Sequence, residues 1–129
     1  MAKKPKKCIT PKKAQKLEEK FAKTIRKALK KEFGKDFSCE FWWSVDELEE
    51  YIKYFKEEAK QKGYTDLGLR FSLGMYEDDE KDGDISGFIK PTGTKAETAS
   101  LKSAAAEPIM IQDVDSYNDG YNDWPPPKG

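Results

Sequence analysis

The fold class is decided by the stretch Leu67-Gly-Leu-Arg-Phe-Ser-Leu-Gly-Met-Tyr76, in which apolar residues occupy every second position. This period of two is typical of a β-strand with one face turned toward a hydrophobic core. The apolar row consists of Leu67, Leu69, Phe71, Leu73 and Met75. The stretch therefore predicts a strand over 67–76 whose apolar row is buried.

A second strand is predicted directly downstream, across a polar turn. The connection over 77–84 contains the turn dipeptide Asp82-Gly83. Apolar residues return over 85–90, and Pro91 lacks the N–H that a further strand residue would donate. We therefore expect a hairpin of 67–76 with 85–90.

A third strand is predicted upstream, over 37–43, from a second aromatic-rich alternation. The alternating residues are Phe37, Cys39, Phe41 and Trp43. Ser44 and Glu47 then form a capping box, which starts a helix over about 45–62. A right-handed crossover through this helix predicts that 37–43 lies parallel to 67–76.

Two amphipathic helices are predicted from apolar residues that recur at spacings of three and four. The first runs over 11–33, where Thr10 supplies the N-cap and Gly34 the end. The second is the helix over 45–62, which Gly63 ends. Their apolar stripes contain Ala14, Leu17, Phe21, Ile25, Ala28 and Leu29, and Val45, Leu48, Ile52, Phe55 and Ala59.

These elements together predict an α+β fold in the order α-β-α-β-β. Two amphipathic helices pack on one face of a small three-stranded sheet, and a flexible C-terminal tail follows. The length of 129 residues suits one domain. We expect a basic disordered arm over 1–9, a compact α+β domain over 10–91, and a linker and Tyr/Trp/Pro-containing tail over 92–129.

The tail leaves two interpretations open. Residues 92–107 hold a single Leu among small and polar residues, too little apolar surface to offset the entropy of ordering. Ile109-Met-Ile111 is a short apolar island that suits an edge strand. Either the tail folds back over the sheet face away from the helices, or it stays free and leaves that face to a partner.

The composition excludes several chemistries. The chain has no His, which removes the usual general base and imidazole ligand, and two Cys are too few for a four-thiolate zinc site. No apolar stretch is long enough to span a bilayer, and the lysine-rich start lacks the apolar region of a secretory signal. We expect a cytoplasmic protein with Cys8 and Cys39 as reduced thiols, although a disulfide between them is an alternative.

Charge is distributed very unevenly. Residues 1–35 carry 14 of the 24 basic residues but only three of the 24 acidic ones. Such a split favours either an anionic partner for the basic segment or contact between the two oppositely charged halves, although lysines also keep a small helix soluble. The candidate residues for binding nucleic acid or another polyanion are Lys12, Lys13, Lys16, Lys20, Lys23 and Lys27.

Aromatic residues indicate a second kind of surface. If the helices cover one sheet face, the opposite face exposes large side chains that suit a protein partner. The tail offers aromatic anchors beside prolines, which limit the cost of ordering. The candidate protein-binding residues are Trp42, Arg70, Tyr76 and Phe88 on the sheet face, beside Lys90, and Tyr117, Tyr121 and Trp124 in the tail.

The acidic turn also fits the first part of a calcium-binding loop. Its spaced residues are Asp78, Glu80, Asp82, Gly83 and Asp84. However, Ile89 stands where a calcium loop needs a bidentate Glu, and a strand follows instead of a helix. A solvated hairpin turn is the simpler interpretation, so we expect no metal and no cofactor.

The segments Ile9-Thr-Pro, Cys39-Glu-Phe-Trp-Trp-Ser-Val-Asp-Glu-Leu-Glu-Glu-Tyr-Ile52 and Asp66-Leu-Gly-Leu-Arg-Phe71, with the Asn118-Asp-Gly-Tyr tail, resemble a group of small bacterial proteins. The resemblance covers about residues 9–91 and the tail. That group has no assigned activity, so the resemblance implies a bacterial cytoplasmic origin and supplies no catalytic residue.

The sequence favours a non-enzymatic protein-binding or adaptor module, either monomeric or weakly dimeric, with an unidentified protein partner. Electrostatic binding of nucleic acid or a polyanion through residues 1–35 is the alternative. A small-molecule enzyme is the least supported class, because no nucleophile–base pair, metal set or phosphate loop is visible.

Overall fold

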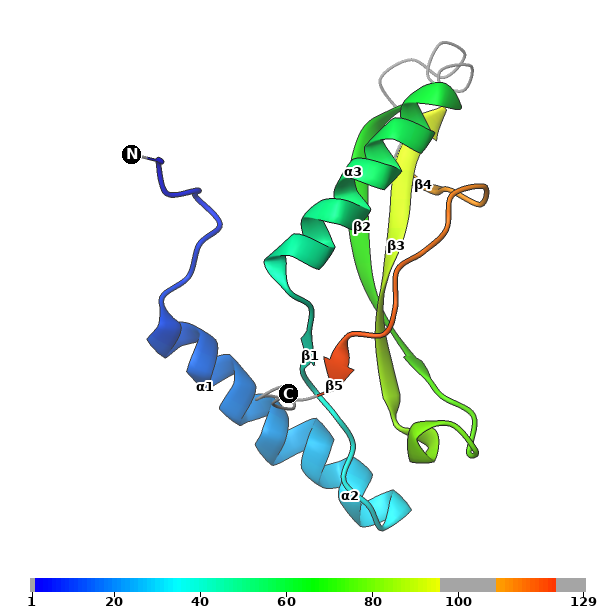
Figure 1. The fold of residues 1–129 in the computed structure, drawn as a ribbon. Helices are drawn as coiled ribbons and strands as arrows, with labels where there is room; N and C mark the ends of the chain where they lie inside the picture. The colour runs from blue at the N-terminus through cyan, green and yellow to red at the C-terminus, as the bar shows by residue number, and fades with distance from the viewer. Residues whose placement is uncertain (1, 96–108, 123–129) are drawn as a thin grey trace. The chain divides into compact units, whose positions relative to one another are not determined.

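The computed structural model describes residues 2–95 and 109–122. The chain divides into two compact units, Met1–Phe37 and Ser38–Gly129. The chain is α+β with a three-stranded sheet, as predicted (Figure 1), but the sheet is antiparallel throughout, whereas the sequence predicts one parallel pair. Within the described ranges, no helix is both long enough and apolar enough to cross a membrane.

The N-terminal unit is one helical segment, in agreement with the predicted helix over 11–33. It consists of α1 (Pro11–Phe21), the π-helical turn η1 (Ala22–Arg26) and α2 (Lys27–Phe33). The Thr10 hydroxyl accepts a hydrogen bond from the Lys13 N–H, which caps the start, and Gly34 ends the segment at φ +71°. No side chain of α1, η1 or α2 is buried, whereas Phe37, which follows the helical segment, is buried.

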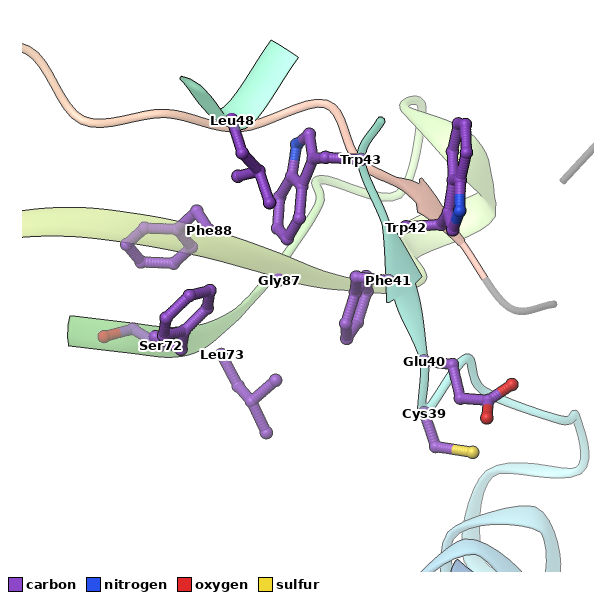
Figure 2. Close-up of a pocket in the computed structure, with 11 residues that line it drawn as sticks. Cys39, Glu40, Phe41, Trp42, Trp43, Leu48, Ser72, Leu73, Gly87 and Phe88 are labelled. Atoms are coloured by element: carbon purple, nitrogen blue, oxygen red, sulfur yellow. The ribbon is translucent and has the colours of Figure 1, made fainter. Parts of the chain in front are cut away.

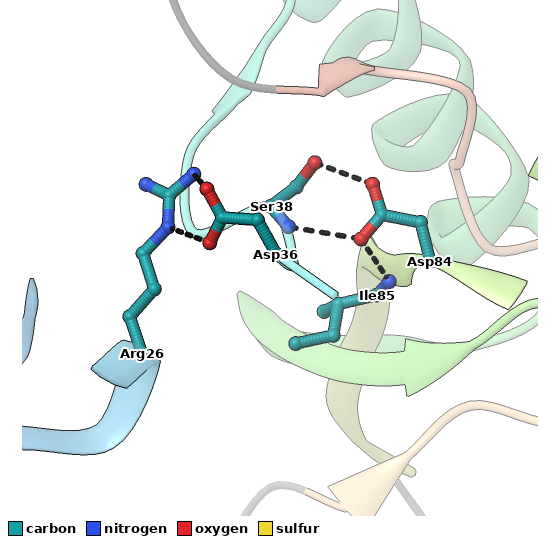
Figure 3. Close-up of polar contacts among 5 residues, drawn as sticks. All are labelled: Arg26, Asp36, Ser38, Asp84 and Ile85. Atoms are coloured by element: carbon teal, nitrogen blue, oxygen red, sulfur yellow. Dashed lines mark hydrogen bonds and ion pairs between the residues drawn. The ribbon is translucent and has the colours of Figure 1, made fainter. Parts of the chain in front are cut away.

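An ion pair joins the middle of this segment to the chain that follows it (Figure 3). Arg26 contacts Asp36 at two points, with Nε 2.8 Å from Oδ1 and Nη2 3.1 Å from Oδ2. The hydrogen bond from Arg26, assisted by its charge, lowers the pKa of the Asp36 carboxyl. Phe33 and Phe37 pack edge to face beside it, with ring centroids 5.6 Å apart.

The C-terminal unit contains the sheet, whose strand order is β2-β3-β4. Strand β2 (Tyr64–Met75) pairs with β3 (Ile85–Lys95), which confirms the predicted hairpin. Strand β4 (Ile109–Met110) pairs with β3, so the apolar island does form an edge strand. Helix α3 (Val45–Gln61) starts at the Ser44 cap and packs against β2.

The prediction that 37–43 forms the third strand of the sheet was wrong. Only β1 (Phe41–Trp42) of the segment 37–43 is extended in a ladder, and it pairs antiparallel with β5 (Tyr121–Asn122), apart from the main sheet. The reason lies in Ser38, whose N–H and hydroxyl both donate to the Asp84 carboxylate (Figure 3). A side chain therefore satisfies the backbone donor that a sheet ladder would otherwise use.

Strand β3 continues to Lys95, past the predicted stop at Pro91. The Pro91 carbonyl accepts a hydrogen bond from the Ile111 N–H, at 2.9 Å. The nitrogen and carbonyl of one strand residue point to the same side, so the missing donor of Pro91 faces β4. Pro91 therefore removes none of the hydrogen bonds between β3 and β2.

The core of this unit lies between α3, β3 and the segment after β4. Its buried members are Tyr51, Phe55, Ala59, Ile89, Ile111 and Val114. Two of these, Ile111 and Val114, belong to the C-terminal segment. Residues 109–122 are thus packed into the fold, while the predicted linker over 96–108 and the last residues, 123–129, lie outside the described part of the chain.

The prediction that the apolar row of β2 is buried was wrong for most of its members. Phe71, Leu73 and Met75 are 65%, 69% and 63% exposed, whereas Leu69 is half-buried. Phe71 lies opposite the buried Ile89, so the row does share the core face. However, β4 adds beside β3, which makes β3 the central strand and leaves β2 at the edge of the covered area.

Candidate binding groove

A hollow of about 390 Å³ opens between β1, the start of α3 and the β2–β3 hairpin (Figure 2). Its walls are mostly apolar, because aromatic and aliphatic side chains from all three places reach it. We call this the apolar groove and define it by Phe41, Trp43, Leu48, Phe71 and Leu73. Such apolar concavities are the usual form of a binding site.

Close contact between Phe41 and Gly87 forms one side of the groove (Figure 2). A Cβ at Gly87 would lie 2.5 Å from the Phe41 ring, so only glycine allows this approach. Gly87 pairs with Leu73 on β2. The aromatic ring of β1 thus crosses the sheet face next to the exposed row of β2.

The C-terminal segment holds Trp43 in place. The indole Nε1–H donates to the Asn118 carbonyl at 3.1 Å, and Gly120 lies so close that a Cβ there would be 2.7 Å from the indole. The Asn118 side chain in turn accepts a hydrogen bond from the Ser86 hydroxyl. The groove wall at Trp43 therefore depends on residues more than 70 positions downstream.

A second hollow, of about 520 Å³, lies on the other side of the α3 N-terminal turn. It is lined by Glu47, Glu50, Tyr51, Tyr54 and residues 115–117. Tyr117 stacks on Tyr51 with ring centroids 4.8 Å apart, and two hydrogen bonds join Tyr117 to Ile89 across a β-bridge. These contacts attach the C-terminal segment to both α3 and β3.

The Tyr51 hydroxyl donates to the Asp115 carbonyl at 2.8 Å within this attachment. Burial, with smaller contributions from Tyr54 and Asp115, raises the pKa of Tyr51 to about 12. Burial and the carboxylates of Glu47 and Glu50 raise the pKa of Tyr117 as well.

Stability should therefore fall in alkaline solution. Because the folded state holds the Tyr51 proton more tightly than the unfolded chain, whose phenol ionises near 10, the stabilisation is complete below pH 10. It is lost as the pH rises toward 12. Urea unfolding at pH 8 and pH 11 measures this loss, which Tyr51→Phe should reduce. Tyr54→Phe, one turn away, should reduce it much less, because Tyr54 makes only one of the smaller contributions to the raised pKa of Tyr51. An equal effect of both variants would contradict the assignment of the alkaline loss to Tyr51.

The structure places three of the sequence-predicted residues on one sheet face. They are Arg70, Phe88 and Lys90. Arg70 pairs with Lys90, and Phe88 forms the next cross-strand pair on that face with Ser72. Phe88 lies over Gly74, where a Cβ would be 3.1 Å from its ring.

The other predicted protein-binding residues lie elsewhere. Trp42 is in β1 and faces away from Trp43 (Figure 2), while the Tyr76 ring lies 4.7 Å from the Lys81 ammonium. Tyr117 is part of the α3 attachment described above. Tyr121 lies in β5, opposite Trp42, and Trp124 is outside the described residues.

The candidate polyanion-binding lysines all lie in α1, η1 and α2, and all are exposed. They are Lys12, Lys13, Lys16, Lys20, Lys23 and Lys27. Neither cysteine is in a disulfide, and Cys8 is exposed while Cys39 is half-buried.

Sequence reasoning missed most of the groove. The alternation predicts a buried sheet face for Phe41, Trp43, Phe71 and Leu73, because their residue types are those of a core. Asp84 was weighed as a calcium ligand, yet its carboxylate accepts hydrogen bonds from Ser38 and from the Ile85 N–H. In the described ranges, no three acidic or thiol side chains gather closely enough to hold a metal ion.

The fold and the groove define a small α+β module with an exposed apolar edge. No family model matches the chain, and neither a curated protein nor a solved structure matches it.

Proposed function

We propose that the protein is a non-enzymatic protein-binding module that takes an extended peptide segment of a partner protein at the free edge of β2. The observation that carries this proposal is the exposed apolar row of Phe71, Leu73 and Met75 on an edge strand. Within the described residues, no strand pairs with the outer edge of β2.

A free strand edge presents unpaired N–H and C=O groups, which an extended peptide satisfies by adding a further strand. Such a peptide presents alternate side chains to the same face as the exposed row of β2. Phe71 and Leu73 also line the apolar groove, so these alternate side chains enter it when they are apolar. Backbone pairing then supplies affinity and the groove supplies selectivity.

The C-terminal segment has a supporting role in this proposal. Tyr117 stacks on Tyr51 and pairs with Ile89, so its ring is already occupied within the fold. Asn118 holds Trp43 at the groove. In this proposal the segment around Tyr117 and Asn118 therefore builds the binding surface instead of acting as the recognition segment. We also propose a cytoplasmic location, which two cysteines outside any disulfide support.

Selection from a displayed library of random peptides tests the proposal. Run at low concentration of the full chain, it should enrich peptides with apolar residues at every second position. Leu73→Glu should weaken binding of the enriched peptides by more than about tenfold, or 1.4 kcal/mol. Val45→Glu is the matched control, because Val45 is 70% exposed and lies outside the groove. Unchanged binding to the Leu73→Glu variant would rule out the groove as the site.

Binding of a polyanion through α1, η1 and α2 is the second candidate, and one observation favours it. The six candidate lysines are all exposed on one helical segment with no acidic residue in the first turn of α1. Affinity for a labelled single-stranded oligonucleotide should then fall steeply as salt rises, with a slope set by the number of phosphates contacted. Salt-independent binding would reject direct phosphate contact.

A further inference from the structure

We infer that β2 of a second copy of this chain is the strand that adds at the free edge, so that the protein forms a two-fold symmetric dimer. This inference rests on the proposed function, because it names the partner of the same edge. A dimer of this kind brings the same surface of each copy together, so the edge must be complementary to itself.

The usable edge is regular over Gly68–Met75. A bulge interrupts the pairing of β2 with β3 between Thr65 and Gly68, and Asp66 in the bulge has φ +49°. Beyond it, every residue from Gly68 to Met75 has a partner on β3 without a break. The twist and backbone spacing of this stretch therefore suit another strand on its outer side.

Antiparallel pairing centred on Phe71 joins the two apolar rows. Phe71 then lies opposite the partner's Phe71, and Leu69 lies opposite the partner's Leu73. On the other face, Arg70 lies opposite the partner's Ser72, and Gly68 opposite the partner's Gly74. Apolar cross-strand pairs stabilise a sheet, and this register contains no pair of like charges.

Neighbouring registers are less favourable. Centring on Arg70 places it opposite the partner's Arg70, and like charges directly opposite one another destabilise a sheet. Centring on Ser72 places Leu67 opposite the partner's Glu77. A shift by an odd number of residues pairs the apolar row with the opposite face. The register centred on Phe71 is thus the one in which both faces match.

Strand β2 also lacks the features by which monomeric proteins protect an edge. Protected edges carry lysines, prolines or charges on the covered face. Between Gly68 and Met75 the only charge is Arg70, which lies on the opposite face from the exposed apolar row. By contrast, β3 carries both Lys90 and Pro91. The unprotected strand is the one that has no partner among the described residues.

Opposite charges introduced at Phe71 test the dimer, because Phe71 of one copy lies opposite Phe71 of the other copy across the two-fold axis. Sedimentation of the full chain over a range of concentrations should show a dimer of the 14.8 kDa protomer. Phe71→Lys and Phe71→Glu should each weaken the dimer by about tenfold or more, since each pairs like charges. An equal mixture of the two variants should restore a heterodimer. Phe71 is 65% exposed, so both variants should remain folded.

Two outcomes would overturn the inference: a wild-type chain that stays monomeric at high concentration, or a dimer that neither charge weakens. Val45→Glu is the control and should dimerise like wild type. The peptide selection separates this inference from the proposed function. A monomeric chain that still selects alternating apolar peptides loses only the dimer, whereas a monomeric chain that selects none loses both.

Discussion

Replacing Ile111 with alanine is expected to lower the free energy of unfolding by about 2–5 kcal/mol. Ile111 is 1% exposed and packs among α3, β3 and β2, with its Cδ1 close to Gly93. Truncation removes buried methyl groups and leaves a cavity that the surrounding sheet fills only in part. Urea unfolding followed by circular dichroism measures the loss.

Ile109 provides a matched control two positions away. It has the same side chain and lies in the same segment, but it is 67% exposed. Ile109→Ala should therefore change stability by less than about 0.5 kcal/mol. Equal and small effects at both positions would mean that residues 109–122 do not pack on α3 and β3 in solution, and the groove wall at Trp43 would then lose its support.

Local features of the sequence are sufficient to predict the helices and the hairpin. Thr10 and Ser44 start their helices where predicted because a side-chain cap acts on N–H groups only three residues away. The hairpin of β2 and β3 follows from two apolar stretches joined by a polar connection that contains the turn dipeptide Asp82-Gly83. Such signals lie within a few residues of the structure that they specify, so one sequence contains them in full.

The burial of the β2 row could not be predicted in this way. Alternation shows that a strand has one apolar face, but not which other elements cover that face. Which strand of the sheet is covered depends on the pairing of Ile109 and Met110 with β3. These two residues lie far from β2 in the sequence. Pairing over such a distance depends on the whole fold, and two apolar residues gave only a weak indication of it.

The groove could not be predicted from the sequence, for a related reason. Phe41 was assigned to a regular strand, whereas its ring crosses the sheet over Gly87. A glycine in a strand often marks a close approach by another group, and Gly87 is the residue of the sequence that indicates such an approach here. It does not identify the group that approaches. The exposed sheet face was easier to predict, because Arg70, Phe88 and Lys90 follow directly from the alternation.

Gly87→Val should have the second large effect, a loss of about 1–3 kcal/mol or more in unfolding free energy. A Cβ at this position would lie 2.5 Å from two ring carbons of Phe41, and valine adds two further methyl groups. The ring must then leave the sheet face, so β1 is displaced and the groove loses one side. Binding of the selected peptides should weaken together with stability.

A double-mutant cycle with Phe41→Ala identifies the cause. If the valine is costly because it collides with the Phe41 ring, removing the ring should recover most of the loss, and the two changes should be strongly non-additive. An unchanged cost of Gly87→Val in the Phe41→Ala background would show that the ring does not lie over Gly87. Peptide binding gives a second readout, because the double variant regains stability while it still lacks one wall of the groove. Stability and binding should therefore separate in this variant, which a purely structural role of Phe41 does not predict.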